Sequence, residues 1–247
     1  MPYRLGLLAV MLVGGALVGV LFADSPLLAL TLFVGIVTAV LVLTLRRSQR
    51  GAHQNNRGIT LMAEGRLVEA IAAFEAAAKD MGVNPLPPFN VAMTKLWLWR
   101  LEESRVGLEK TTTTLRGRPL RQMAAPALLF IAALQNDRAK AVVLEKEIAA
   151  LQLERSAVVA MGRAVFHARE KRWKDVLDDL TLERTRPLGG PARAVADALR
   201  GWALVELGGT CPPLDTVGVF GETGPAALRQ WWPEFADFLE RVASRPH

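Results

Sequence analysis

Two long apolar runs near the start of the chain constrain its fold more than any other feature. Leu5–Ala23 and Leu27–Leu45 each hold about 19 residues, and neither contains a charged side chain. A helix of that length spans the hydrocarbon core of a bilayer, which is about 30 Å thick. The short segment 24–26 between the runs leaves room only for a tight turn. The sequence therefore predicts a transmembrane hairpin, with everything after Arg46 tethered to a membrane.

Two other interpretations of these runs fit less well. A buried core helix usually carries a polar stripe, which both runs lack. A cleaved signal peptide would need a small-x-small site at the end of the first run, and Leu21-Phe22-Ala23 is a poor one. Small residues recur at every fourth position of both runs: Gly15, Gly19 and Ala23, then Thr31, Gly35 and Ala39. Such a ridge packs helices closely in lipid, either within the hairpin or between two copies in a homo-oligomer.

The basic residues predict the orientation of the hairpin. They flank the two runs at Arg4, Arg46, Arg47 and Arg50, whereas the turn between the runs carries only Asp24. Positively charged flanks stay on the cytoplasmic side of a membrane. We therefore expect an integral protein of the cytoplasmic (inner) membrane with both termini and the remaining domain in the cytoplasm. The arginines after the second run should also attract anionic lipid headgroups, by about 1 kcal/mol each.

The rest of the chain predicts one helix after another. Apolar residues recur at spacings of three and four, and Gly, Pro and Asn punctuate them at short intervals. The expected helices are 53–63, 66–80, 88–99, 101–115, 120–134, 137–150, 154–169, 172–184, 191–207 and 226–243, the last interrupted at Pro233. We expect three parts: a two-helix anchor over 1–50, helical repeats over 51–186, and a further helix, a Gly/Pro-rich loop and a capping helix over 187–247.

Small and large apolar residues within 54–79 follow the spacing of a tight helix pair. They are Gly58, Leu61, Gly65, Ala70, Phe74 and Ala77. This pattern resembles a tetratricopeptide repeat. The resemblance implies that Gly58 and Ala70 lie where two helices cross, that Gly65 turns the chain, and that Phe74 packs toward the next unit. Pairs of this kind bury their apolar faces only by stacking, so the expected fold class is all-α, with a tetratricopeptide-like α-solenoid.

Further units follow the first with increasing departures. Adding 34 residues gives Ala92, Ser104 and Leu108, and a looser match continues through Ala141, Ala164, Val176 and Leu180. Lys95 stands where a large apolar residue is expected, and Trp99 replaces the turn glycine. Glu145 occupies the position of Phe74. Beyond the second unit the pattern also fits a generic α-solenoid.

The resemblance implies a scaffold that holds an extended peptide or protein in a groove lined by the first helix of each pair. Asn56 and Asn90 are 34 residues apart, so they occupy equivalent positions and are candidate peptide ligands through their amide groups. The alternative is that each asparagine caps a helix. Trp231 and Trp232 open an aromatic C-terminal segment, which either caps the repeats or contacts a partner.

Other classes of function find little support in the sequence. The net charge of +6 comes from basic residues interspersed with acidic ones, without the aromatic interleaving of a nucleic-acid groove. The three histidines, His53, His167 and His247, show no metal-ligand spacing. One cysteine, Cys211, cannot form an internal disulfide. We therefore expect no catalytic residue, no cofactor, no metal and no nucleic-acid partner.

The sequence thus predicts a membrane-anchored scaffold on the cytoplasmic face that binds protein partners. One alternative is an assembly factor, similar to those of cytochrome c maturation or envelope biogenesis, whose repeats work outside the cytoplasm. A second alternative is a structural subunit of a membrane complex, contacted through its hairpin.

Overall fold

The structure is a computed structural model, and it describes residues 25–113 and 118–244. Within these two stretches every regular element is helical. The first apolar run, with its ridge at Gly15, Gly19 and Ala23, lies outside the described residues. The elements are α2 (Pro26–Ala63), α3 (Leu67–Met81), α4 (Leu86–Trp97), α5 (Leu101–Thr112), α6 (Arg118–Leu134), α7 (Arg138–Ala150), α8 (Ala157–Arg169), α9 (Trp173–Asp179), α10 (Leu182–Thr185), α11 (Gly190–Glu206), α12 (Thr216–Phe220), η1 (Gly221–Thr223), α13 (Pro225–Trp231) and α14 (Pro233–Ala243).

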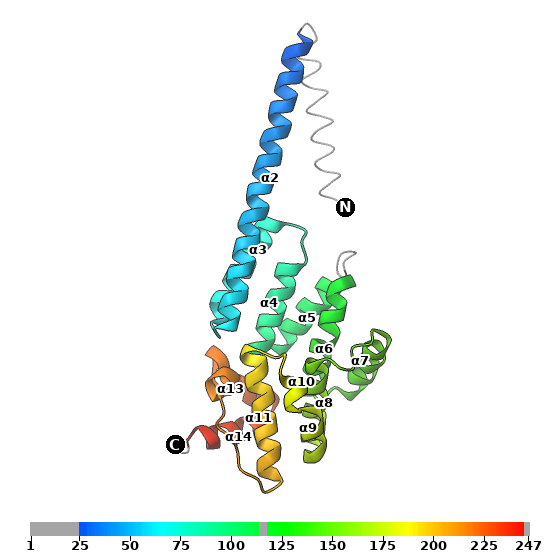
Figure 1. The fold of residues 1–247 in the computed structure, drawn as a ribbon, viewed down its shortest axis with the longest axis vertical. Coiled ribbons are helices and arrows are strands. Elements are labelled where there is room, and N and C mark those ends of the chain that lie inside the picture. Colours follow the sequence, from blue (N-terminus) through cyan, green and yellow to red (C-terminus); the bar gives the residue numbers. More distant parts are fainter. Residues whose placement is uncertain (1–24, 114–117, 245–247) are drawn as a thin grey trace.

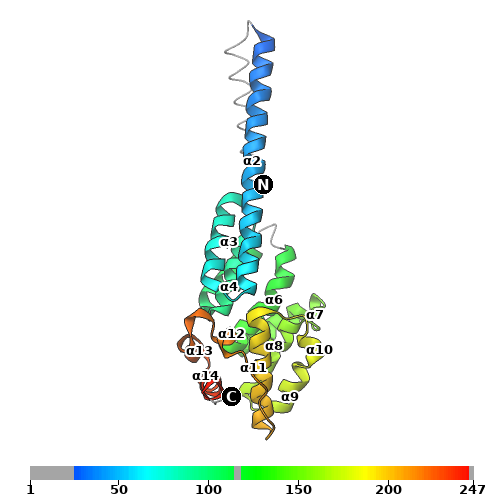
Figure 2. The same ribbon diagram turned by 60° about the vertical axis from the view of Figure 1, so that its left-hand side comes forward.

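Helix α2 is one continuous helix of 38 residues. The sequence predicted two separate elements here, 27–45 and 53–63, and the structure joins them. The intervening residues 46–52 are mostly Arg, Gln, Ser and Ala, which tolerate a helix, and they include no proline. The apolar half projects away from the other helices in both views (Figures 1 and 2). It is long and apolar enough to cross a membrane, and it is not buried against any other part of the chain that the structure describes.

The same turn ends six helices of the domain; one of the six, at Gln152, ends α7, and the other five recur at a regular spacing. The residue of positive φ in the five regularly spaced turns is Gly65, Trp99, Asn136, Lys171 or Gly208. Successive residues of this series are 34, 37, 35 and 37 positions apart. The N–H of the following residue donates in each case to the carbonyl five positions earlier, at 2.8–3.0 Å. This bond satisfies a helix-end carbonyl that would otherwise lack a partner. The turns divide the domain into helix-turn units that begin with α2, α4, α6, α8 and α11.

Trp99 adopts the left-handed conformation that glycine adopts at Gly65, with φ of +58° against +78°. A bulky residue is strained there. Tertiary bonds hold it in place: its indole Nε1 donates to the carbonyl of Val219 at 3.0 Å, and its own carbonyl accepts from Nε1 of Trp231 at 2.9 Å. The departure from the repeat pattern at Trp99 therefore fastens the C-terminal segment to the second unit.

The first unit packs most closely where small residues were expected. A methyl group on Gly58 would lie 2.6–2.9 Å from ring atoms of Phe74, so the ring of Phe74 on α3 packs directly against the backbone of α2. Residues with predicted packing roles are buried in both of the first two units: Gly58, Leu61, Ala70, Phe74, Ala77, Ala92, Ser104 and Leu108. Gly65 lies in the turn and is half-buried. The Ser104 hydroxyl is buried without a hydrogen-bond partner, at the position that alanine occupies in the first unit.

The later helices depart from the expected bounds in two places. The expected helix 172–184 divides into α9 and α10, because Thr181 leaves the helix and its Oγ1 accepts from the N–H of Arg184 at 3.3 Å. The predicted interruption of the C-terminal helix at Pro233 is confirmed: α14 starts there, since proline suits the first turn of a helix. Helix α12 and η1 form within the segment that the sequence predicted to be a loop.

The C-terminal segment packs back across several units. Helix α12 packs on α11 and η1 contacts α3, while a carboxylate of Glu222 accepts from the N–H of Val68 at 3.3 Å. The guanidinium of Arg169 donates to the carbonyls of Leu134 and Trp231, at 2.7 and 2.9 Å. Helix α11 also begins beside the end of α2: a methyl on Gly190 would lie 3.7 Å from the carbonyl of Ala63. The first and last units therefore touch.

Candidate partner-binding groove

Helices α7 and α8 are an exception to the packing of neighbouring units. The second helix of one unit packs on the first helix of the next at α3 and α4, at α5 and α6, and at α9 and α11. Helices α7 and α8 both pack on α6, but they do not pack closely on each other. A hollow of about 530 Å³ opens between them. We call this hollow the α7–α8 groove; it is lined by Leu129, Arg138, Ala141, Val142, Glu145, Lys146, Arg163, Phe166, His167, Glu170 and Arg172.

The groove opens where Glu145 takes the place of a core residue. The equivalent residues of the other units, Phe74, Leu108 and Leu180, are fully buried. Phe74 belongs to an apolar cluster against which Val91 of α4 packs. Glu145 follows the turn residue Asn136 by nine residues, as Phe74 follows Gly65. The matching contact between α7 and α8 is an ion pair, in which Arg163 donates to both carboxylate oxygens of Glu145 at 2.8 and 2.6 Å. A charged pair keeps water nearby, so the two helices stay apart.

The walls of the groove carry more positive than negative charge. Arg138 pairs with Glu170 and lies over the ring of Phe166, at 5.5 Å from its centroid. Arg172 pairs with the same Glu170 at 2.6 Å. The hydrogen bond from Arg138 holds the pKa of Glu170 below its usual value. Lys146 completes the rim and is exposed.

Beneath these walls the floor is apolar. It consists of Leu129 and Ala141, both buried, and of the half-buried ring of Phe166. The four cations of the lining face only two carboxylates. An apolar floor beneath a net positive rim suits a ligand with an apolar stripe flanked by acidic side chains.

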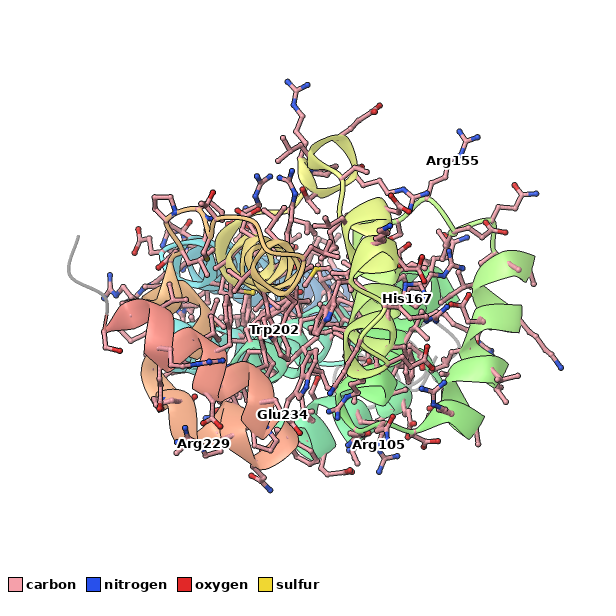
Figure 3. The ribbon with its side chains drawn as sticks, turned by 90° about the horizontal axis from the view of Figure 1, so that it is seen from below. Arg105, Arg155, His167, Trp202, Arg229 and Glu234 are labelled. Carbon is pink, nitrogen blue, oxygen red and sulfur yellow. The ribbon has the colours of Figure 1, made fainter. Side chains whose placement is uncertain are left out.

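A half-buried pair of titratable groups, His167 and Asp179, lies beside the groove, which His167 lines. Nδ1 of His167 is 3.1 Å from Oδ2 of Asp179, and Arg184 approaches the other carboxylate oxygen at 3.4 Å. Burial raises the pKa of Asp179 above its usual value. In Figure 3 His167 lies on α8, between that helix and α7. The residues that line the groove include no serine, threonine or cysteine, so the His–Asp pair has no nucleophile beside it there.

The structure separates the two predicted asparagines. Nδ2 of Asn90 donates to Oδ1 of Asn55 at 2.9 Å, and Asn55 is buried. The side chain of Asn56 is exposed on α2. The groove that was expected along the first helices is also filled at α6, where every residue from Ala124 to Leu134 is buried. The open groove lies instead between α7 and α8, and the sequence signal for it was Glu145 at the position of Phe74.

The aromatic C-terminal segment packs into the domain. Trp202 of α11 lies at the centre of a cluster of rings (Figure 3), with centroids 5.0–5.7 Å away in Trp173, Trp232, Phe235 and Phe238. Trp232 is only 2% exposed, and Arg169 lies over its ring at 4.9 Å. Trp231 is half-buried, with its Nε1 bonded to Trp99. A partner would reach Trp232 only if this segment moved.

Among residues 25–113 and 118–244, no group of three or more His, Cys, Asp and Glu side chains is arranged to hold a metal ion. No protein-family model, curated protein or solved structure matches the chain.

Proposed function

We propose that this chain is a membrane-anchored adaptor that binds a protein partner through the α7–α8 groove. The apolar half of α2 anchors the domain, together with the first apolar run. The partner segment is an amphipathic helix whose apolar face covers Leu129 and Phe166 and whose carboxylates meet the basic rim. The observation that carries the proposal is the ion pair of Glu145 and Arg163 at a position that is core in the other units, because α7 and α8 stay apart there while the corresponding helices of the other units pack on each other.

The tetratricopeptide resemblance supports the same proposal. Five turns of one geometry recur at intervals of 34–37 residues, as expected of repeated helix pairs. Repeats of this kind present surfaces to protein partners. We propose the cytoplasmic face as the side on which the domain lies, because Arg46, Arg47 and Arg50 follow the apolar half of α2 and are exposed. No cofactor and no catalytic step form part of the proposal.

Reversing one rim charge tests the groove. Lys146→Glu should lower partner capture by roughly threefold to tenfold, because an attractive contact with an acidic partner becomes a repulsive one. Capture is measured in cells with a photocrosslinking residue at position 142, since Val142 lines the groove and is 57% exposed. The crosslinked peptide, identified by mass spectrometry, should carry acidic residues beside an apolar stripe.

Two controls make this result specific. A crosslinker at Val106, which is 54% exposed on α5 outside the groove, should not capture the same peptide. Lys110→Glu makes the same charge change at an exposed lysine of α5 and should leave capture unchanged. Equal losses from Lys146→Glu and Lys110→Glu would reject the groove as the binding site.

The proposed orientation is tested with reporter fusions. Alkaline phosphatase fused after Arg50 should be inactive, because the enzyme folds only outside the cytoplasm, and a fluorescent protein fused at the same point should fluoresce. The physical reason is the positive flank at Arg46–Arg50. Active phosphatase would place the domain on the other side of the membrane. That result would favour an assembly factor over a cytoplasmic adaptor.

A further inference from the structure

The connection between α3 and α4 lies beside the start of the domain on α2. A methyl group on Gly51 would overlap the Met81 side chain and lie 3.2 Å from Cβ of Asp80. The end of α3 is therefore level with Gly51. Figure 1 shows this connection at the end of the domain that is nearest to the apolar half of α2.

Because α2 is unbroken, distances along it follow from the helical rise. Gly51 comes six residues after Leu45, the last apolar residue of the span, which corresponds to about 9 Å. Val83 lies two residues past the end of α3, in the connection that Figure 1 shows on the side of the apolar half of α2. Two residues span at most about 7 Å, so Val83 lies between about 2 and 9 Å from the level of Leu45. The headgroup layer on each side of a bilayer is about 5–7 Å thick. The α3–α4 connection therefore reaches the headgroup layer when α2 spans the membrane.

The first turn of α4 has no unpaired backbone N–H group, which suits surroundings that contain little water. A helix start normally exposes four N–H groups. Here the N–H of Leu86 donates to Oδ1 of Asn84 at 3.0 Å, and Pro87–Pro88 have no N–H. The N–H of Phe89 donates to the carbonyl of Pro85 at 3.0 Å. This turn therefore enters an interface without leaving a backbone donor unpaired.

The side chains of the connection match the same surroundings. Val83 is 45% exposed, and Leu86, at the start of α4, is half-buried. Lys79 on α3 is exposed, as are Arg47 and Arg50 on α2. An apolar tip flanked by cations is the pattern of a segment that inserts into an anionic headgroup layer.

We propose that residues 81–86, the α3–α4 tip, form a second membrane contact, in which Val83 inserts among the headgroups of anionic lipid. With α2 it makes a two-point attachment that fixes the orientation of the domain. This inference rests on the membrane anchoring in the proposed function, and it does not depend on the α7–α8 groove.

The test measures the depth of a spin label in the full chain. Cys211 is first replaced by serine, and single cysteines are introduced by Val83→Cys, Val217→Cys and Val34→Cys. The protein is placed in nanodiscs of phosphatidylcholine with one quarter phosphatidylglycerol. Collision with a water-soluble nickel reagent and with lipid-soluble oxygen is then measured for each nitroxide.

Val217 is the matched control, because it is 78% exposed and lines a hollow with Ala63, about 27 Å beyond Leu45. The label at position 83 should collide with nickel at least twofold less than the label at 217. The label at Val34, on the apolar half of α2, should collide mainly with oxygen. Equal nickel access at positions 83 and 217, with the label at Val34 in lipid, would reject the contact of the α3–α4 tip with the membrane. The anchoring through α2 would stand. Free nickel access at Val34 would reject the membrane anchor, and the tip contact with it.

Discussion

Replacing Trp202 with alanine should destabilise the domain by about 3–5 kcal/mol, the cost of deleting a large buried aromatic side chain. Trp202 is 6% exposed, and four other aromatic rings lie within 6 Å of its centroid. Three of those rings belong to the C-terminal segment, so we expect this segment to detach from α11 before the rest unfolds. Urea unfolding of the detergent-solubilised chain, followed by circular dichroism, measures the loss.

Trp202→Phe is the matched control for this prediction. It keeps an aromatic ring in the cluster and removes the bond from Nε1 to Glu206, which is 3.0 Å long. We expect a loss of about 0.5–1.5 kcal/mol from the bond, with a smaller contribution from the lost ring volume. A loss below 1 kcal/mol for Trp202→Ala would show that the C-terminal segment does not depend on this cluster.

Gly58→Leu should overpack the first unit and lower the free energy of unfolding by about 1–3 kcal/mol or more. The first atom of any side chain at this position already meets the ring of Phe74 at 2.6–2.9 Å. Helices α2 and α3 would have to separate, which also opens the cluster that contains Leu61 and Ala70. The melting temperature of the full chain in detergent, read from tryptophan fluorescence, should fall.

Gly35 supplies a control on the same helix. A methyl at Gly35 meets no atom of residues 25–113 or 118–244 within 4 Å, so Gly35→Leu should leave the melting temperature of the domain unchanged. Gly58→Ala alone should lower the stability of the domain. Adding Phe74→Leu should recover part of that loss, because leucine at position 74 is smaller than phenylalanine and makes room for the methyl group at position 58. Unchanged melting of Gly58→Leu would show that the helix pair does not cross at this residue.

Local patterns in the sequence were enough to predict the helical class and the packing of the first unit. Gly58, Ala70 and Phe74 interact within one helix pair, so their spacing carries the geometry. Trp99 could be recognised as a departure from the repeat, but its stabilising bonds come from residues more than a hundred positions away. No local pattern contains that information.

The proposed partner site was harder to predict, because it also depends on contacts between different units. The 34-residue spacing paired Asn56 with Asn90, but residues at equivalent positions of two units need not face each other, and Asn55 is the neighbour that Asn90 contacts. Glu145 was visible as an exception to the repeat pattern. Its consequence, a groove in place of a packed helix contact, depends on Arg163 in the next unit and on how far α7 and α8 separate around them.

Because α2 is unbroken, it connects its apolar half rigidly to the domain. A rod of 38 residues transmits rotation about its axis, and its last third carries the packing face formed by Asn55, Gly58 and Leu61. One residue inserted between Arg47 and Gly51 would turn that face by about 100° relative to the span. In the proposed membrane-anchored protein, the length of this short segment would therefore set the direction in which the α7–α8 groove faces along the plane of the membrane.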